Sequence, residues 1–229
     1  MSIAENLRAI EARIASACAA AGRDPATVRL LAVSKTKPGA AIEEALAAGQ
    51  RAFGENYAQE LRDKVRDFAG ADPAPEWHFI GHLQRNKVKY AVGKAALLHA
   101  VDSLRLAEAI GGRAAREGIE QDVLVEVNVG GEASKSGVAP EEALALCEAI
   151  QAIEGVTVRG LMTIPPFRED PADVGPFFER LAALAAEGRQ RGLPLTELSM
   201  GMSHDFEVAV AHGATIIRVG TAIFGAREG

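Results

Sequence analysis

Short apolar runs alternate with amphipathic stretches along the whole sequence, and this alternation limits the fold more than any other feature. Each apolar run is suited to a buried strand, and each amphipathic stretch is typical of a helix. The predicted strands are residues 28–33, 51–54, 77–80, 97–101, 123–127, 156–164, 195–199 and 215–219. The predicted helices are residues 3–21, 38–48, 56–68, 84–92, 103–117, 140–153, 174–191 and 203–212. Strict alternation predicts a parallel sheet covered by helices, which is an α/β fold.

The number of strand–helix units favours one closed architecture. Eight strands in 229 residues give about 29 residues per unit, enough for a strand and a crossover helix. Eight units can close into a (β/α)8 TIM barrel, with residues 3–21 as an extra N-terminal helix. The alternative is an open doubly wound sheet, but its G-x-G-x-x-G fingerprint is absent after the first strand. Because no linker divides the chain, we expect a single domain over residues 1–229.

Composition excludes several classes of function. The net charge of −6, with 48% hydrophobic and 24% charged residues, is that of an ordinary globular protein and lacks the basic excess of a nucleic-acid binder. Cys18 and Cys147 lie far apart in helical patterns, which indicates buried small hydrophobes in a reducing compartment. The sequence has no apolar run of 18 residues and no signal-peptide pattern near its start. We therefore expect a cytoplasmic protein with no membrane or nucleic-acid partner.

A lysine follows the first predicted strand, where barrel enzymes place their active sites. Partial desolvation and nearby cations would lower the pKa of the Lys35 amine, and a neutral amine attacks an aldehyde to form a Schiff base. Two other interpretations stay open. Lys35 is equally compatible with a solvated loop position, and Lys37 is a second candidate, although Pro38 places it in the turn before the next helix.

Two segments near the C-terminus are suited to binding a phosphate. Residues 199–203 (SMGMS) follow the seventh strand, and Gly220 and Thr221 follow the eighth. Small residues let backbone N–H groups approach a phosphate, Ser203 and Thr221 add hydroxyl donors, and barrels often bind phosphate at these two loops. The alternative is an ordinary helix cap at Ser203 and a tight turn at Gly220.

An arginine lies two residues before Gly220 and shares its face of the last strand. If Arg218 points into the barrel mouth, it needs an anionic or acceptor partner, either a ligand or an internal carboxylate such as Glu126. Metal binding is not expected, because His78 and His82 flank a strand that separates them too widely for one ion.

An aldehyde-trapping lysine, a phosphate cradle and an inward arginine together suggest pyridoxal 5′-phosphate (PLP). The sequence resembles the pyridoxal phosphate homeostasis proteins, single-domain relatives of alanine racemase. The segments that carry this resemblance run in order across almost the whole chain: AVSKTKP (32–38), FGENY (53–57), WHFIG (77–81) with Leu83, Gln84, Asn86 and Lys87, Val127 and Asn128 with Glu132, Lys135, Ser136 and Gly137, RGLMTI (159–164), LSMGMS (198–203) with Asp205, and RVGTAIFG (218–225).

The resemblance implies a barrel of the fold-type III, PLP-binding class and a role for each matching residue. Lys35 would hold the cofactor as an internal aldimine, and Arg218 would face its pyridine nitrogen. The remaining implied contacts are Ser203, Gly220 and Thr221 at the phosphate, Asn56 near the phenolic oxygen, and Met202 and Met162 near the ring.

The resemblance also implies a function. Arginine can only donate, so the ring nitrogen facing it stays unprotonated and the ring is a weak electron sink. Alanine racemase compensates with a tyrosine from a second domain, which this chain has no residues left to form. We therefore expect a monomeric protein of intracellular PLP homeostasis that stores or delivers PLP without substantial turnover. Apo forms of PLP-dependent enzymes would receive the cofactor.

Two enzymatic alternatives remain. One is a PLP-dependent racemase-like enzyme that uses Lys35 as a base. The other is an aldolase-like barrel acting on a sugar phosphate, which would use the same lysine and phosphate loops but has no need of Arg218 beside a ring nitrogen.

Overall fold

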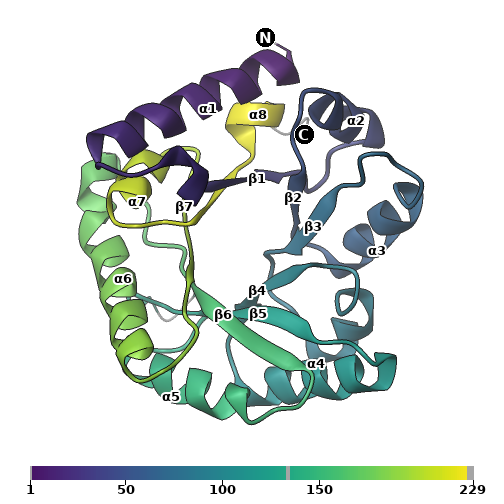
Figure 1. Cartoon of the computed structure of the whole chain (residues 1–229), viewed down its shortest axis with the longest axis vertical. Helices are drawn as coiled ribbons and strands as arrows, with labels where there is room; N and C mark the ends of the chain where they lie inside the picture. Colours follow the sequence, from purple (N-terminus) through teal and green to yellow (C-terminus); the bar gives the residue numbers. More distant parts are fainter. Residues whose placement is uncertain (1, 133–134, 226–229) are drawn as a thin grey trace.

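The computed structural model describes residues 2–132 and 135–225, and in this part of the chain eight parallel strands close into a barrel (Figure 1). Neighbours in the sequence are neighbours in the sheet, and β8 pairs back onto β1. The strands are β1 Arg29–Val33, β2 Ala52–Glu55, β3 Glu76–Phe79, β4 Leu97–Val101, β5 Gln121–Glu126, β6 Val156–Met162, β7 Glu197–Met202 and β8 Ile216–Val219. The closed (β/α)8 barrel is confirmed over the open sheet.

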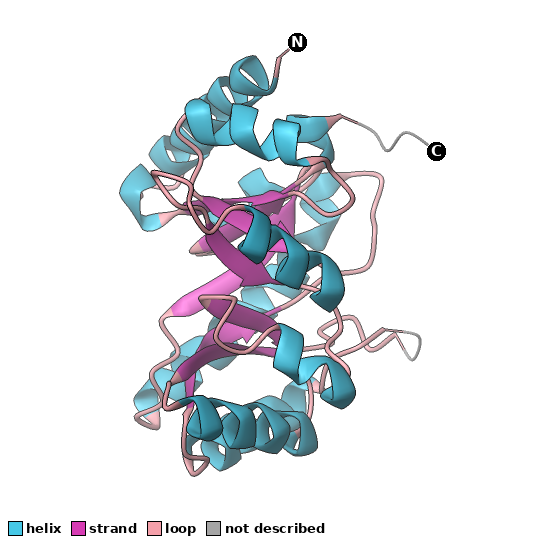
Figure 2. Cartoon of the chain, turned by 90° about the vertical axis from the view of Figure 1, so that its right-hand side faces the viewer, coloured by secondary structure: helices cyan, strands magenta, loops and turns pink. Residues whose placement is uncertain are grey.

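Helices surround the strands on all sides (Figures 1 and 2). They are α1 Ile3–Ala20, α2 Gly39–Ala47, α3 Ala58–Asp67, α4 Leu104–Glu117, α5 Pro140–Gln151, α6 Gly175–Gln190, α7 Phe206–Ala211 and α8 Thr221–Phe224. Short 3₁₀ helices are η1 Pro25–Thr27, η2 Arg85–Tyr90 and η3 Pro171–Val174. The extra N-terminal helix α1 packs against α7, α8 and α2, where a longer eighth helix would otherwise lie.

Several boundaries differ from the sequence-based expectations. Within the stretch 84–92, residues 85–90 form a 3₁₀ helix instead of an α-helix, and Val88 is the one buried residue of those six. The seventh strand spans Glu197–Met202 instead of residues 195–199, and turn-type backbone bonds at Leu195 and Thr196 account for its later start. As a result the next helix begins at Phe206, three residues after Ser203.

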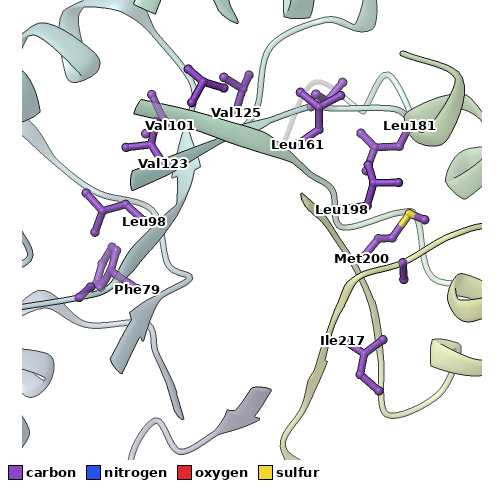
Figure 3. Packing of buried hydrophobic residues seen from close by; sticks show 14 of the residues in the cluster. Phe79, Leu98, Val101, Val123, Val125, Leu161, Leu181, Leu198, Met200 and Ile217 are labelled. Atoms are coloured by element: carbon purple, nitrogen blue, oxygen red, sulfur yellow. The ribbon is translucent and has the colours of Figure 1, made fainter. Parts of the chain in front are cut away.

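The apolar residues form two clusters separated by the wall of the barrel. The larger one lies between strands and helices, and Figure 3 shows Leu181 of α6 beside Leu161 of β6 and Leu198 of β7. The smaller one fills the barrel interior: Leu31, Ala52, Leu97, Ala100, Leu124, Met162 and Ile216, with Ile80 against them. Within the described residues, no helix is both long and apolar enough to cross a membrane. The filled interior leaves the C-terminal mouth as the place for a site.

Candidate functional site

A cavity of about 320 Å³ opens at the C-terminal ends of the strands. Its lining contains Val33, Lys35, Lys37, Asn56, Ile80, Ile164, Met202, Ser203, His204, Arg218, Gly220, Thr221 and Gly225. The structure brings together seven of the eight residues that the sequence suggested for cofactor binding, namely Lys35, Asn56, Met202, Ser203, Arg218, Gly220 and Thr221. Met162 is different, since it packs in the barrel interior.

The loop that carries Lys35 rests on a buried ion-pair network. Lys64 of α3 donates to Glu55 Oε1 at 2.8 Å, to Glu60 Oε1 at 2.8 Å and to the carbonyl of Ser34 at 2.7 Å. Ser34 Oγ donates to Glu55 Oε1 at 2.6 Å. The chain leaves β1 through this contact and turns at Thr36, whose φ is 62° and whose N–H donates to Glu60 Oε1 at 2.6 Å. These bonds fix the backbone on both sides of Lys35.

Burial also changes the acidity of this network. Burial raises the pKa of Glu55 to about 6, while Lys64 and Ser34 act in the opposite direction. Glu55 Oε2 is buried without a hydrogen-bond partner among the described residues. The network therefore holds a carboxyl whose charge depends on the lysine beside it.

The two lysines of the loop have different surroundings. Lys37 Nζ donates to the carbonyls of Phe224 at 3.0 Å and Gly225 at 3.3 Å, at the end of α8. Its amine therefore ties the last helix to the barrel mouth. Lys35 and Lys37 are both half-buried and both line the cavity, and Lys35 lies nearer the end of β1.

The two small-residue segments meet across the cavity. Thr221 Oγ1 donates to Ser203 Oγ at 3.4 Å, which brings the loops after β7 and β8 together. Asp205 Oδ1 accepts the N–H of Met202 at 2.6 Å and closes the turn that contains Ser203. Ser203 is therefore a turn residue and not the helix cap that the sequence left open as an alternative, since α7 begins at Phe206. Gly220 lies against β1, and a Cβ there would stand 3.3 Å from the Val33 carbonyl oxygen.

Arg218 reaches the cavity from inside the barrel and is only 4% exposed. It donates to Ser199 Oγ at 2.6 Å and to the carbonyl of Thr163 at 2.8 Å. Among the described residues, the direct salt bridge to Glu126 that the sequence left open is not formed. Burial lowers the pKa of Arg218 to about 10 while Asp205 and Glu126 act against it, so the side chain stays cationic at neutral pH.

Asn56 completes the wall with an unsatisfied amide. Its Oδ1 is buried and has no hydrogen-bond partner within the described residues. A Cβ on Gly81 would lie 2.2 Å from the Asn56 carbonyl oxygen, so a glycine is needed for the two loops to meet. A buried polar atom without a partner at a cavity wall is suited to a polar group of a ligand.

Sequence reasoning missed several residues that support this site. Lys64 and His99 are buried polar side chains, of which Lys64 holds the Lys35 loop and His99 contacts Ser199. Ser199 belongs to the segment predicted to bind phosphate, but it is buried and accepts from Arg218 instead. His99 had a visible signal, since it interrupts the apolar strand LLHAV. His78, tested above only as a metal ligand, contacts His99 and Glu76 instead. No group of three or more potential ligands suited to a metal occurs within the described ranges.

Comparison with known proteins agrees with this geometry. The family model that matches residues 6–228 describes the N-terminal domain of alanine racemase. A protein from Aquifex aeolicus named pyridoxal phosphate homeostasis protein is 48% identical over 229 residues, covering 100% of both chains. The structure of PipY from Synechococcus elongatus with PLP bound has a TM-score of 0.85 and 39% identity, and covers 98% of this chain and 100% of that one. Alanine racemase from Corynebacterium glutamicum shares the fold, with a TM-score of 0.72 and 21% identity, but this chain covers only 62% of it.

Proposed function

Since the chain belongs to the alanine racemase N-terminal domain family, and within it to the pyridoxal phosphate homeostasis proteins, we propose that its cavity binds PLP. Its function is then intracellular PLP homeostasis, in which Lys35 holds the group for storage or delivery without substantial turnover. The observation that carries this proposal is the convergence of Lys35, Asn56, Met202, Ser203, Arg218, Gly220 and Thr221 around one cavity of about 320 Å³.

The polar groups around this cavity fit the parts of PLP. Ser203 and Thr221 place two hydroxyls together beside the small Gly220, as a phosphate requires. The buried Asn56 amide oxygen lacks a partner among the described residues and can take a polar substituent of the ring. Val33, Ile80 and Ile164 supply apolar walls for the ring itself.

When bound, PLP supplies an aldehyde carbon that an amine attacks reversibly. Lys35 provides that amine, and the Glu55–Lys64 network holds the backbone on which it sits. Arg218 is fixed by Ser199 and Thr163 and has only N–H donors to offer the pyridine nitrogen. A ring nitrogen that accepts from a guanidinium does not take up a proton, which disfavours carbanion chemistry and favours holding over turnover.

The alternative is a PLP-dependent racemase-like enzyme, and it needs a second base across the ring. In addition to Lys35, His204 lines the cavity and is the candidate for this second base. The His204 ring nitrogen lies 3.1 Å from the Arg168 carbonyl and 3.2 Å from the Glu169 carbonyl, and its ring contacts Phe167. These contacts hold the imidazole of His204 against the loop after β6, which argues against its use as a base.

The remaining parts of the proposal concern the surroundings of the protein. It acts as a cytoplasmic monomer, and apo forms of PLP-dependent enzymes are its recipients. Reversible attachment to Lys35 supports this role, because a recipient lysine can displace the carrier lysine by amine exchange. Against a dimer, the large apolar side chains exposed among the described residues are few and come from four separate stretches of the sequence: Tyr57, Leu104, Ile119, and Ile164 with Phe167.

Titration of the apoprotein with PLP tests the proposal directly. We expect visible absorbance that borohydride reduction fixes as a pyridoxyl group on Lys35. Lys35→Ala should abolish this adduct, whereas Lys37→Ala is the matched control and should retain it. A protein that remains colourless, or an adduct on Lys37, would contradict the proposal.

A second measurement separates holding from turnover. The loaded protein is incubated with single-enantiomer amino acids in deuterated water, and deuterium at the α-carbon is followed by NMR. We expect no incorporation at a catalytic rate. Rapid incorporation that depends on Lys35 would favour the racemase-like alternative.

A further inference from the structure

A chain of hydrogen bonds runs through the barrel from Arg218 at the mouth to Glu76 at the opposite end, and we call it the interior chain. Arg218 donates to Ser199 Oγ at 2.6 Å, and Ser199 Oγ lies 2.9 Å from His99 Nδ1. His99 Nε2 lies 2.9 Å from His78 Nδ1, and His78 Nε2 lies 2.7 Å from Glu76 Oε1. Four strands, β8, β7, β4 and β3, contribute its members.

The interior chain is polar in surroundings that are otherwise apolar. His78, His99 and Ser199 are fully buried, and the barrel interior around them is filled by an apolar cluster. Only the last member reaches the surface, where Glu76 forms a half-exposed salt bridge with Arg29 at 3.0 Å. Buried polar groups are retained in such places when each one is satisfied by its neighbour.

The chemistry of the two ends sets the direction of every bond. An ionised Glu76 can only accept, so His78 Nε2 must carry a proton. If His78 is neutral, its Nδ1 then accepts from His99 Nε2–H, and the Nδ1 of a neutral His99 accepts from the Ser199 hydroxyl. Ser199 Oγ is left with lone pairs for Arg218, which can only donate. In this arrangement both histidines are Nε2–H tautomers, and no member is left unsatisfied.

The acidities of the groups agree with this assignment. Burial, with help from the neighbouring His78, holds the pKa of His99 well below its ordinary value, so its ring is neutral. The hydrogen bond from His78 lowers the pKa of Glu76, so the carboxylate at the far end is ionised at neutral pH.

We propose that the interior chain positions Arg218 for PLP, with Ser199 and His99 as positioning residues and Glu76 as the group that sets their direction. The inference rests on the proposed function, since Arg218 is the residue that would face the ring nitrogen. The guanidinium is a rigid planar fork, so bonds from its two ends to Ser199 and Thr163 fix its plane. Ser199 Oγ can accept the hydrogen bond from Arg218 with its own hydroxyl satisfied only while His99 Nδ1 accepts the hydrogen bond from that hydroxyl.

The tautomers provide a test that does not depend on PLP. In the apoprotein labelled with ¹⁵N-histidine, we expect His78 and His99 to appear as neutral Nε2–H forms at neutral pH. Glu76→Gln should produce a mixture of tautomers, because a neutral amide can either accept or donate. Arg29→Gln is the matched control, since it breaks the same surface salt bridge but keeps the carboxylate. Nδ1–H forms or an imidazolium in the parent would overturn the proposal.

Two substitutions at one position separate positioning from a merely structural role. The His99→Asn substitution places an amide oxygen where Nδ1 accepts from Ser199, whereas His99→Gln replaces only the Nε2 contact to His78. We expect His99→Asn to bind PLP within about twofold of the parent and His99→Gln about tenfold more weakly. Of these two variants, only His99→Gln should change the ¹⁵N chemical shift of the PLP ring nitrogen relative to the parent.

Ser199→Ala provides a second route should a His99 variant fail to fold, and it should weaken PLP binding like His99→Gln. Equal affinity and equal ring-nitrogen shift in His99→Gln, Ser199→Ala and the parent would overturn the positioning role. The failure of the proposed function would look different, because the parent itself would then bind no PLP while its histidine tautomers could still be read.

Discussion

Lys64 is a buried lysine whose three N–H donors are all used, two by carboxylates and one by a backbone carbonyl. It is the cation that compensates Glu55, whose side chain is completely buried. In a low-dielectric interior, a pair of this kind is stable as a unit, whereas a single remaining charge is costly.

Lys64→Met should therefore lower the free energy of unfolding by about 3–5 kcal/mol, the usual effect of removing one partner of a buried ion pair. It should also weaken PLP binding, because the Ser34 carbonyl loses its donor next to Lys35. Chemical denaturation and PLP titration measure the two effects. Arg62→Met on the same helix is the control, since its partner Asp63 is exposed and the expected loss is below about 1 kcal/mol. Equal losses in both variants would contradict the argument.

Glu126 makes stability depend on pH in a predictable direction. Burial, with the nearby Asp102, raises the pKa of Glu126 to about 7 from its ordinary 4.5, and its Oε2 is buried without a partner among the described residues. Between these two pH values the unfolded chain loses the proton before the folded chain does. Stability from this group is therefore fully present below pH 4.5 and lost as the pH rises through 7, by an amount on the order of 3 kcal/mol.

Glu126→Gln keeps the shape of the side chain and removes this titration. We expect the variant to gain stability relative to the parent as the pH rises from 4.5 to about 7, with the full difference present above that range. Urea denaturation at a series of pH values across this range measures it. Parallel pH profiles for the two proteins would show that the buried carboxyl is not the source.

The sequence could predict which residues line the cavity but not which residues support them. Lys35, Ser203 and Arg218 stand at strand ends, where the barrel pattern itself directs attention. His99, Ser199 and Lys64 lie within a strand or a helix. The bonds that tie them to the site, from Lys64 to Ser34, between His99 and Ser199, and from Arg218 to Ser199, join residues 19 to 100 positions apart. No local pattern encodes such distant pairs, so only the closed barrel could reveal them.

At the scale of elements, the end of β7, just before the turn to α7, depends on one glycine. Gly201 has a φ of +91°, and a Cβ there would stand 2.6 Å from Ala209 Cβ and 2.9 Å from Phe206 Cα. Met202 and Ser203 follow directly and line the cavity. Gly213 has a similar φ of +94° but no atom nearer than Leu198 Cδ1 at 4.0 Å, which makes it a matched comparison.

Gly213→Ala should cost about 1–2 kcal/mol, the strain of a side chain at positive φ. Gly201→Ala should cost about 1–3 kcal/mol more because of the clash, and should weaken PLP binding by displacing Met202 and Ser203. Thermal unfolding and PLP titration of both variants measure these effects. The same loss of stability in both, with unchanged affinity, would show that close packing at Gly201 does not shape the site.

The strands were the elements best predicted from the sequence, because each is a short apolar run bounded by polar residues. The helices between residues 84 and 92 and after residue 203 were less well predicted. Both follow barrel-mouth loops, where residues such as Gln84 and Asp205 form turn contacts that override helical periodicity. Residues 221–224 form a helical turn that had no predicted counterpart, since four residues are too short to show a period.

At the scale of the whole molecule, the pairing of β1 with β8 makes every strand an interior strand of one sheet. Unfolding either half would expose two unpaired strand edges and open the apolar interior, which spans β1, β2, β4, β5, β6 and β8. Helix α1 reinforces the closure, because it packs on α2 near the start of the chain and on α7 and α8 near its end. These contacts leave no natural boundary between two folding units.

We therefore predict that the chain behaves as one domain and unfolds in a single cooperative transition. The one tryptophan, Trp77 on β3, packs between Phe53 and Phe68 and reports locally on the β2–β3–α3 region by fluorescence. Far-ultraviolet circular dichroism reports on helices around the entire barrel. In urea, the two signals should give the same midpoint and the same slope. Separate midpoints would mean that the region around Trp77 unfolds independently, and the barrel would then have to be divided into two cooperative units.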